Sequence, residues 1–159
     1  MILVTVGSQL GFDRLIGTVA TWARERGERD LLLQTGPCSL DLAGLPHVAS
    51  LPPDETRRAF ERARVIIGHA GMGTIIDCLL MGKPLVILPR KAALGEHRND
   101  HQMATARRFA NRAGVTVAWD EIELRRRLDD LDSLLAPQKI EPYASPELLA
   151  AVRSFIHGR

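Results

Sequence analysis

The stretch VIIGHAGMGTIIDCLLMGKPLVILP, residues 65–89, decides the fold of this chain. It opens with a short apolar, β-branched run at residues 65–67, which is typical of a buried strand. A glycine-rich turn at residues 69–73 follows and leads into a helix that the apolar spacing predicts over residues 74–81. Residues 85–88 predict a second buried strand. The unit is therefore a strand, a crossover helix and a second strand that is parallel to the first.

The glycine turn lies where a helix begins, and this position favours anion binding. Backbone N–H groups at a helix N-terminus have no partner inside the helix, and the helix dipole adds positive charge there. Gly71 and Gly73 carry no side chain that would keep a ligand away from this backbone. A second glycine loop, which begins at Gly7 and Ser8, follows the first predicted strand. Either loop alone would favour a simple tight turn, but two loops at one sheet edge favour a diphosphate site.

The remaining chain continues the alternation of strands and helices. Further strands are predicted at residues 1–6, 30–35, 47–51 and 115–118, and further helices at residues 13–26, 53–64, 100–113, 120–135 and 146–156. This order predicts an α/β fold with one Rossmann-like, doubly wound parallel sheet of about six strands. No repeat or linker divides the chain, so we expect residues 1–159 to form a single domain.

Composition narrows the classes of function. The chain is 45% hydrophobic and 25% charged, as in ordinary globular proteins, and its net charge of +2 does not indicate a nucleic-acid partner. It contains no apolar run near the roughly 18 residues of a membrane span, and no signal peptide is recognisable. Cys38 and Cys78 lie far apart without a CxxC partner, so reduced thiols and a cytoplasmic location are expected.

The glycine loops do not match the common nucleotide motifs. The first loop reads GSQLG instead of GxGxxG, and the strand at residues 30–35 ends in Gln34 and Thr35, with no acid to hold an NAD ribose. No GK[ST] sequence exists for a P-loop. Both observations count against a dinucleotide or P-loop site.

Thr74 and Asp77 lie three residues apart at the start of the predicted helix. Thr74 could donate to a phosphate while Asp77 accepts hydrogen bonds from ribose hydroxyls. The alternative is a capping box, in which Thr74 caps the helix and Asp77 reaches back to the cap. The sequence leaves these two interpretations open.

The polar segment after residue 89 offers groups that suit a carbohydrate. Glu96, Asn99, His101 and Gln102 can all exchange hydrogen bonds with sugar hydroxyls. A zinc site from Glu96, His97 and His101 is a weaker alternative, because no further ligand has a recognisable spacing. We therefore expect no metal here. His69, at the end of a strand, is a weak candidate for a catalytic base.

These residues resemble a known family. HAGMGTIIDCLLMGKPLVILP followed by NDHQ resembles the C-terminal, donor-binding domain of glycosyltransferase family 28. The opening VTVGSQLGFDRL is similar to the small soluble subunits, of the PssE and Alg13 types, of two-component glycosyltransferases. The resemblance covers about residues 1–115. It implies a fold equivalent to the C-terminal half of a GT-B enzyme and a UDP-sugar as donor, with no further cofactor.

The resemblance also implies roles for individual positions. The residues expected to hold the diphosphate are Gly7, Ser8, Gly71, Met72, Gly73 and Thr74. Asp77 stands where the family has a ribose-binding acid. His101 and Gln102 align with a pair that reads the donor sugar, with Glu96 and Asn99 nearby.

The resemblance implies half of an inverting transferase, here a subunit that binds the donor. A membrane-anchored partner of the PssD or Alg14 type is expected to bind a polyprenyl-diphosphate-linked saccharide, to supply the base and to hold this chain at the inner membrane. The first strand begins at Met1, so we expect no acceptor domain before it. The predicted helix at residues 146–156 is the candidate docking element, or else it packs on its own sheet.

The expected pathway is exopolysaccharide synthesis, with UDP-glucuronate as one candidate donor. A UDP-sugar 2-epimerase is disfavoured because those enzymes need both domains in one chain. The main alternative is a non-catalytic module that senses UDP-sugars and binds a partner.

Overall fold

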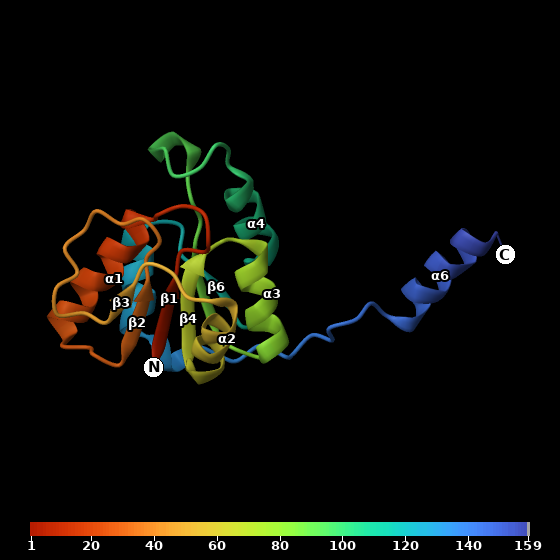
Figure 1. The fold of residues 1–159 in the computed structure, drawn as a ribbon, viewed down its shortest axis with the longest axis horizontal. Helices are drawn as coiled ribbons and strands as arrows, with labels where there is room; N and C mark the ends of the chain where they lie inside the picture. The colour runs from red at the N-terminus through yellow and green to blue at the C-terminus, as the bar shows by residue number, and fades with distance from the viewer. Residues whose placement is uncertain (159) are drawn as a thin grey trace.

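The computed structural model, which describes residues 1–158, contains a six-stranded sheet in which all strands are parallel. The strands are β1 (Ile2–Thr5), β2 (Leu31–Gln34), β3 (His47–Val48), β4 (Val65–His69), β5 (Leu85–Leu88) and β6 (Val115–Val117). Their spatial order is β3-β2-β1-β4-β5-β6 (Figure 1). The chain therefore adds β2 and β3 on one side of β1 and then crosses to add β4, β5 and β6 on the other side. The predicted Rossmann-like, doubly wound architecture is confirmed.

Helices cover both faces of the sheet because side chains alternate along each strand. The helices are α1 (Asp13–Arg26), α2 (Pro53–Arg62), α3 (Met72–Met81), α4 (His101–Phe109), α5 (Glu121–Asp129) and α6 (Pro146–His157), with short 3-10 turns η1 (Ala92–Leu94) and η2 (Leu131–Ser133). Ile2 and Val4 pack with α1 and α5, whereas Leu3 packs with α2, α3 and α4 on the opposite face.

Several elements are shorter than the sequence pattern predicts. The helix predicted over residues 100–113 ends at Phe109, and the helix predicted over residues 120–135 ends at Asp129. The separate turn η2 then brings Leu131 into the core. β3 is limited to two residues, which pair only with Leu33 and Gln34 of β2.

The C-terminal helix α6 lies away from the sheet at the end of an extended segment (Figure 1). None of its residues is buried, and its apolar side chains face solvent. The Ser145 hydroxyl accepts a hydrogen bond from the Leu148 N–H at 3.3 Å, so the predicted cap at the start of this helix is formed. Within residues 1–158, no helix combines the length and apolar character that crossing a bilayer requires.

Candidate functional site

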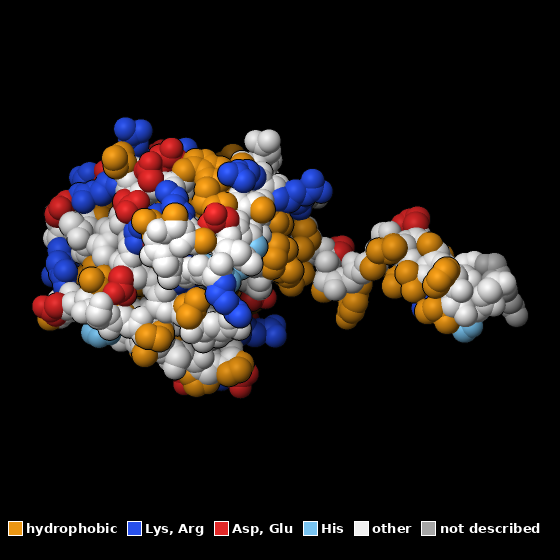
Figure 2. Space-filling view, turned by 90° about the horizontal axis from the view of Figure 1, so that it is seen from above, with side chains coloured by type: hydrophobic (Ala, Val, Ile, Leu, Met, Phe, Trp, Pro, Cys, Tyr) orange, Lys and Arg blue, Asp and Glu red, His pale blue; other side chains and the backbone are white. Residues whose placement is uncertain are grey.

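The two glycine loops meet at the edge where the parallel strands end. β1 and β4 are neighbours, with Thr5 opposite Gly68 in the register, so the loops that follow them lie side by side. Ligands of open α/β sheets bind at such a position, beyond the carboxyl ends of the strands where the strand order reverses. Figure 2 views the molecule from this side.

Two cavities open beside these loops. The first, called the polar cavity below, has a volume of about 310 Å³ and a wall somewhat more polar than apolar, to which His69, Arg90, His101 and Gln102 contribute. The second has a volume of about 570 Å³ and a more apolar wall that includes Leu51, Phe60 and Asp77. Four residues line both cavities: Gly7, Ser8, Gly73 and Thr74. A ligand could therefore extend from one cavity to the other across the glycine loops.

The glycines of these loops differ in what a side chain at each position would meet. A Cβ atom on Gly71 would stand 2.1 Å from Nε2 of His69, and one on Gly7 would stand 2.8 Å from Cε1 of the same ring. Gly7 also has φ +82°, which L-residues rarely adopt. A Cβ on Gly73 would meet nothing within 4 Å. Gly71 is thus required by the His69 ring, and only Gly73 keeps open space in front of the backbone.

His69 is held in its neutral form. Burial, together with the nearby charge of Arg90, lowers the pKa of this imidazole to about 4. Its Nδ1 atom is buried and has no hydrogen-bond partner among the described residues. A group with so low a pKa is a weak proton acceptor at neutral pH, so the geometry does not favour His69 as a catalytic base.

Thr74 and Asp77 do not form the alternative capping box. α3 begins at Met72 with Gly71 as its N-cap, so Thr74 lies inside the first turn. Thr74 is buried between the two cavities, and Asp77 lies one turn further on the wall of the larger cavity. Partial burial raises the pKa of the Asp77 carboxyl above its usual value. Both side chains are therefore free of the cap and face the candidate site.

Gln102 connects two strand ends and faces the polar cavity. Its Oε1 accepts hydrogen bonds from the N–H groups of Ala70 and Arg90, each at 3.2 Å. The amide nitrogen makes no such bond within residues 1–158 and is available to donate to a ligand. His101 lies on the same cavity wall, with its ring edge-to-face against His97 at 4.3 Å between centroids.

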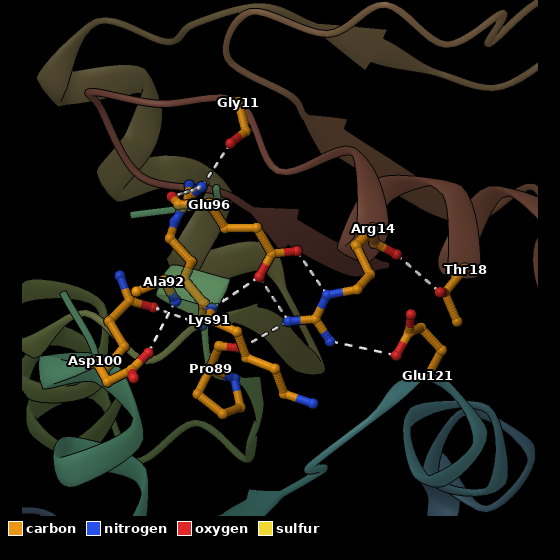
Figure 3. Close-up of polar contacts among 11 residues, drawn as sticks. Gly11, Arg14, Thr18, Pro89, Lys91, Ala92, Glu96, Asp100 and Glu121 are labelled. Atoms are coloured by element: carbon orange, nitrogen blue, oxygen red, sulfur yellow. Dashed lines mark hydrogen bonds and ion pairs between the residues drawn. The ribbon is translucent and has the colours of Figure 1, made fainter. Parts of the chain in front are cut away.

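Glu96 anchors a loop and does not line either cavity. Its carboxylate accepts two hydrogen bonds from Arg14, at 2.6 and 2.8 Å, and one from the Lys91 N–H at 2.8 Å (Figure 3). Both oxygens are used, so the expectation that Glu96 reads a sugar hydroxyl is corrected by this geometry. The described residues also contain no cluster of three or more His, Cys, Asp or Glu side chains placed to hold a metal.

Two other predicted residues lie at the margin of the site. The side-chain oxygen of Asn99 accepts a hydrogen bond from the His101 N–H at 3.3 Å, and Asn99 is absent from both cavity walls. The Met72 side chain is 46% exposed and also lines neither cavity, so only its backbone can serve the diphosphate. The geometry thus brings together Gly7, Ser8, Gly71, Gly73, Thr74, Asp77, His101 and Gln102.

Arg90 is a residue of the site whose burial and contacts the sequence did not indicate, although its place near the cleft was compatible with binding a carboxylate or a diphosphate. Its side chain is only 2% exposed and forms part of the polar cavity wall. The guanidinium donates to the carbonyls of Val6 at 3.0 Å and Leu10 at 2.8 Å. It also stacks on the Phe12 ring, with 4.5 Å from Cζ to the ring centroid. The sequence feature that could have indicated its burial is its position directly after the buried run at residues 85–89.

Comparison with known proteins relates this geometry to glycosyltransferases. Residues 1–144 match the model of the glycosyltransferase family 28 C-terminal domain. The chain is 32% identical over 158 residues to the UDP-N-acetylglucosamine--N-acetylmuramyl-(pentapeptide) pyrophosphoryl-undecaprenol N-acetylglucosamine transferase of Alkalilimnicola ehrlichii, a match that covers 89% of this chain and 42% of the relative. It is 30% identical over 73 residues to the UDP-N-acetylglucosamine transferase subunit ALG13 of Candida albicans, covering 46% and 23%.

Solved structures share the fold. The crystal structure of Acinetobacter baumannii MurG superposes with a TM-score of 0.66 at 21% identity, over 99% of this chain and 49% of that one. The solution structure of ALG13 gives a TM-score of 0.60 at 18% identity, over 95% and 93%. The chain spans less than half the length of the curated relatives it matches. Because the family model covers most of the sequence, the chain belongs to the glycosyltransferase family 28 C-terminal domain family.

Proposed function

We propose that this chain is the donor-binding subunit of a two-component, inverting glycosyltransferase that uses a UDP-sugar. The observation that carries the proposal is the pair of cavities that meet at the glycine loops. The larger, more apolar cavity suits the uridine, with Asp77 accepting from the ribose. The loops that both cavities share suit the diphosphate. The polar cavity then receives the sugar, beside His101 and Gln102.

The electrostatics of the loops suit a departing UDP. The N–H groups of the first turn of α3 have no partner within the helix, and the positive end of the helix dipole adds to them. In the proposed reaction, a base deprotonates an acceptor hydroxyl, and its oxygen attacks the anomeric carbon as the bond to UDP breaks. The negative charge that develops on UDP would be stabilised by these groups, which are in place before the reaction begins.

We propose that the base and the acceptor come from a partner chain. His69 lies beside the polar cavity, but its pKa of about 4 makes it a weak base at neutral pH. The exposed apolar side chains of α6 are consistent with a docking helix for this partner: Leu148, Leu149, Val152, Phe155 and Ile156. A partner of the PssD or Alg14 type, anchored in the membrane, would place this chain at the bilayer, with a polyprenyl-diphosphate-linked saccharide as acceptor.

The donor sugar and the pathway are the finer parts of the proposal. The relatives' names make UDP-N-acetylglucosamine the first donor to test. UDP-glucuronate is the second, because Arg90 lines the polar cavity and can attract a carboxylate. Exopolysaccharide synthesis is the proposed pathway. A non-catalytic sensor of UDP-sugars is the alternative, and transfer of sugar upon co-expression with the partner would exclude it.

Calorimetric titration of the full chain with UDP tests the donor site, with NAD as the control ligand. We expect UDP to bind, and Asp77→Ala to weaken binding by about 1.5–3 kcal/mol, the value of a hydrogen bond to a charged group. Asp54→Ala is the matched control, because Asp54 lies in the first turn of α2 and lines neither cavity. Equal binding of UDP and NAD, or no effect of Asp77→Ala, would contradict the proposed site.

A further inference from the structure

Arg90 is a buried cation that lacks an anionic partner. Its side chain is 2% exposed, yet the ion pairs within 4.0 Å among the described residues do not include it. The four hydrogen bonds of its terminal nitrogens go to neutral backbone carbonyls, those of Val6, Leu10, Gly11 and Glu96. Removing a guanidinium from water without a counter-charge is costly, so such an arrangement calls for an explanation.

The nearest carboxylate is already used by other groups. Glu96 accepts two hydrogen bonds from Arg14 and one from the Lys91 N–H, while Arg14 also contacts Glu121 at 3.3 Å (Figure 3). Burial lowers the pKa of Arg90, and the charge of Glu96 offsets part of this effect. The Glu96 carboxylate is therefore occupied by Arg14 and the Lys91 N–H, and no carboxylate among the described residues pairs directly with Arg90.

The hydrogen bonds of Arg90 also orient the loop that follows β1. The carbonyls of Val6, Leu10 and Gly11 turn toward the guanidinium. The backbone N–H groups of Ser8, Gln9 and Leu10 have no acceptor among residues 1–158. These three residues line the polar cavity together with Arg90. A loop whose carbonyls are engaged on one side and whose N–H groups are free suits an anion.

We infer that Arg90 is a positioning residue of the donor site, and that the diphosphate of the bound nucleotide supplies the anion that Arg90 lacks. The inference rests on the proposed function and deepens it. The guanidinium holds the loop after β1 through three carbonyls, those of Val6, Leu10 and Gly11, and its positive charge lies on the wall of the cavity in which the phosphates would bind. Binding of nucleoside alone does not use this charge, so Arg90 governs the preference for UDP over uridine.

The test compares UDP and uridine on the full chain, by calorimetry for UDP and by NMR titration for uridine. Arg90→Gln keeps hydrogen-bond donors and removes the charge. We expect it to lower the affinity for UDP by about tenfold or more, as for loss of a charge-assisted interaction, and to change that for uridine by less than about twofold. Arg24→Gln is the matched control, because Arg24 also donates to loop carbonyls, those of Asp41 and Ala43, but lies outside both cavities.

A second variant, Arg90→Lys, keeps the positive charge but cannot donate to all four carbonyls. It separates the effect of the charge from the effect of the hydrogen bonds. It also provides a test if Arg90→Gln does not fold. We expect Arg90→Lys to keep part of the preference for UDP over uridine, because the charge remains while the bonds to the loop carbonyls are lost. The inference is overturned if Arg90→Gln binds UDP like the unaltered chain, if both ligands weaken in parallel, or if Arg90→Lys loses as much of the preference as Arg90→Gln. An unaltered chain that binds no UDP would instead overturn the donor site itself.

Discussion

Gly71 and Gly73 stand two residues apart in one turn, yet their surroundings differ. The His69 ring fills the space beside Gly71, whereas the space beside Gly73 is open. Gly71→Ala should therefore destabilise the fold by about 1–3 kcal/mol, because the ring has to move. Gly73→Ala should leave stability unchanged or raise it by up to about 1 kcal/mol, because alanine favours a helix.

The two variants should also separate folding from binding. The methyl group of Gly73→Ala would project into the space that the two cavities share, so we expect weaker UDP binding in a fully folded protein. Urea denaturation and UDP titration of both variants measure this. A Gly73→Ala chain that binds UDP as well as the unaltered chain would place the diphosphate elsewhere.

His69 gives the fold a dependence on pH. Its pKa is about 4 in the folded chain and near the ordinary 6.5 when unfolded, so the unfolded state binds more protons between these values. Stability due to His69 is therefore complete above about pH 6.5 and is lost as the pH falls toward 4, by up to about 3 kcal/mol. Unfolding free energies of the unaltered chain and His69→Gln, measured from pH 4 to 7, should show a flatter curve for the variant. Parallel curves would contradict the assignment.

Among the elements, α6 differs from the other helices because it contributes nothing to the core. None of its residues is buried, whereas Ile140, before it, packs against the domain. Removing residues 145–159 should change the free energy of unfolding by less than about 0.5 kcal/mol, as for surface changes. The same truncation should abolish co-purification with the proposed partner chain.

A point variant refines this test of α6. Phe155 is 89% exposed, and Phe155→Asp should disrupt docking while the domain stays folded. Arg153→Ala, on the same helix, is the control and should leave docking intact. A truncated chain that loses several kcal/mol of stability would show that α6 packs on its own domain in solution.

At the scale of the whole molecule, the local pattern of apolar residues predicted the architecture. The details of the site depend on contacts between residues that lie far apart in the sequence. The runs that form β1, β4 and β5 are continuous and apolar, so their burial and parallel order could be read from the sequence. The pairing of Glu96 with Arg14 spans 82 residues and has no local signal. The burial of Arg90 by the loop after β1 is equally non-local. Spacing therefore placed both glycine loops at one sheet edge, but it did not predict the ion pair that occupies Glu96.

The exposed apolar side chains of α6 have a consequence for the amount of this chain that a cell can maintain. A continuous exposed apolar surface is where unassembled chains aggregate and where chaperones and proteases act. A copy made in excess of its proposed partner would keep this surface open, whereas a partnered copy would hide it. The same helix would thus hold the two subunits in balanced amounts, with surplus copies removed before they accumulate.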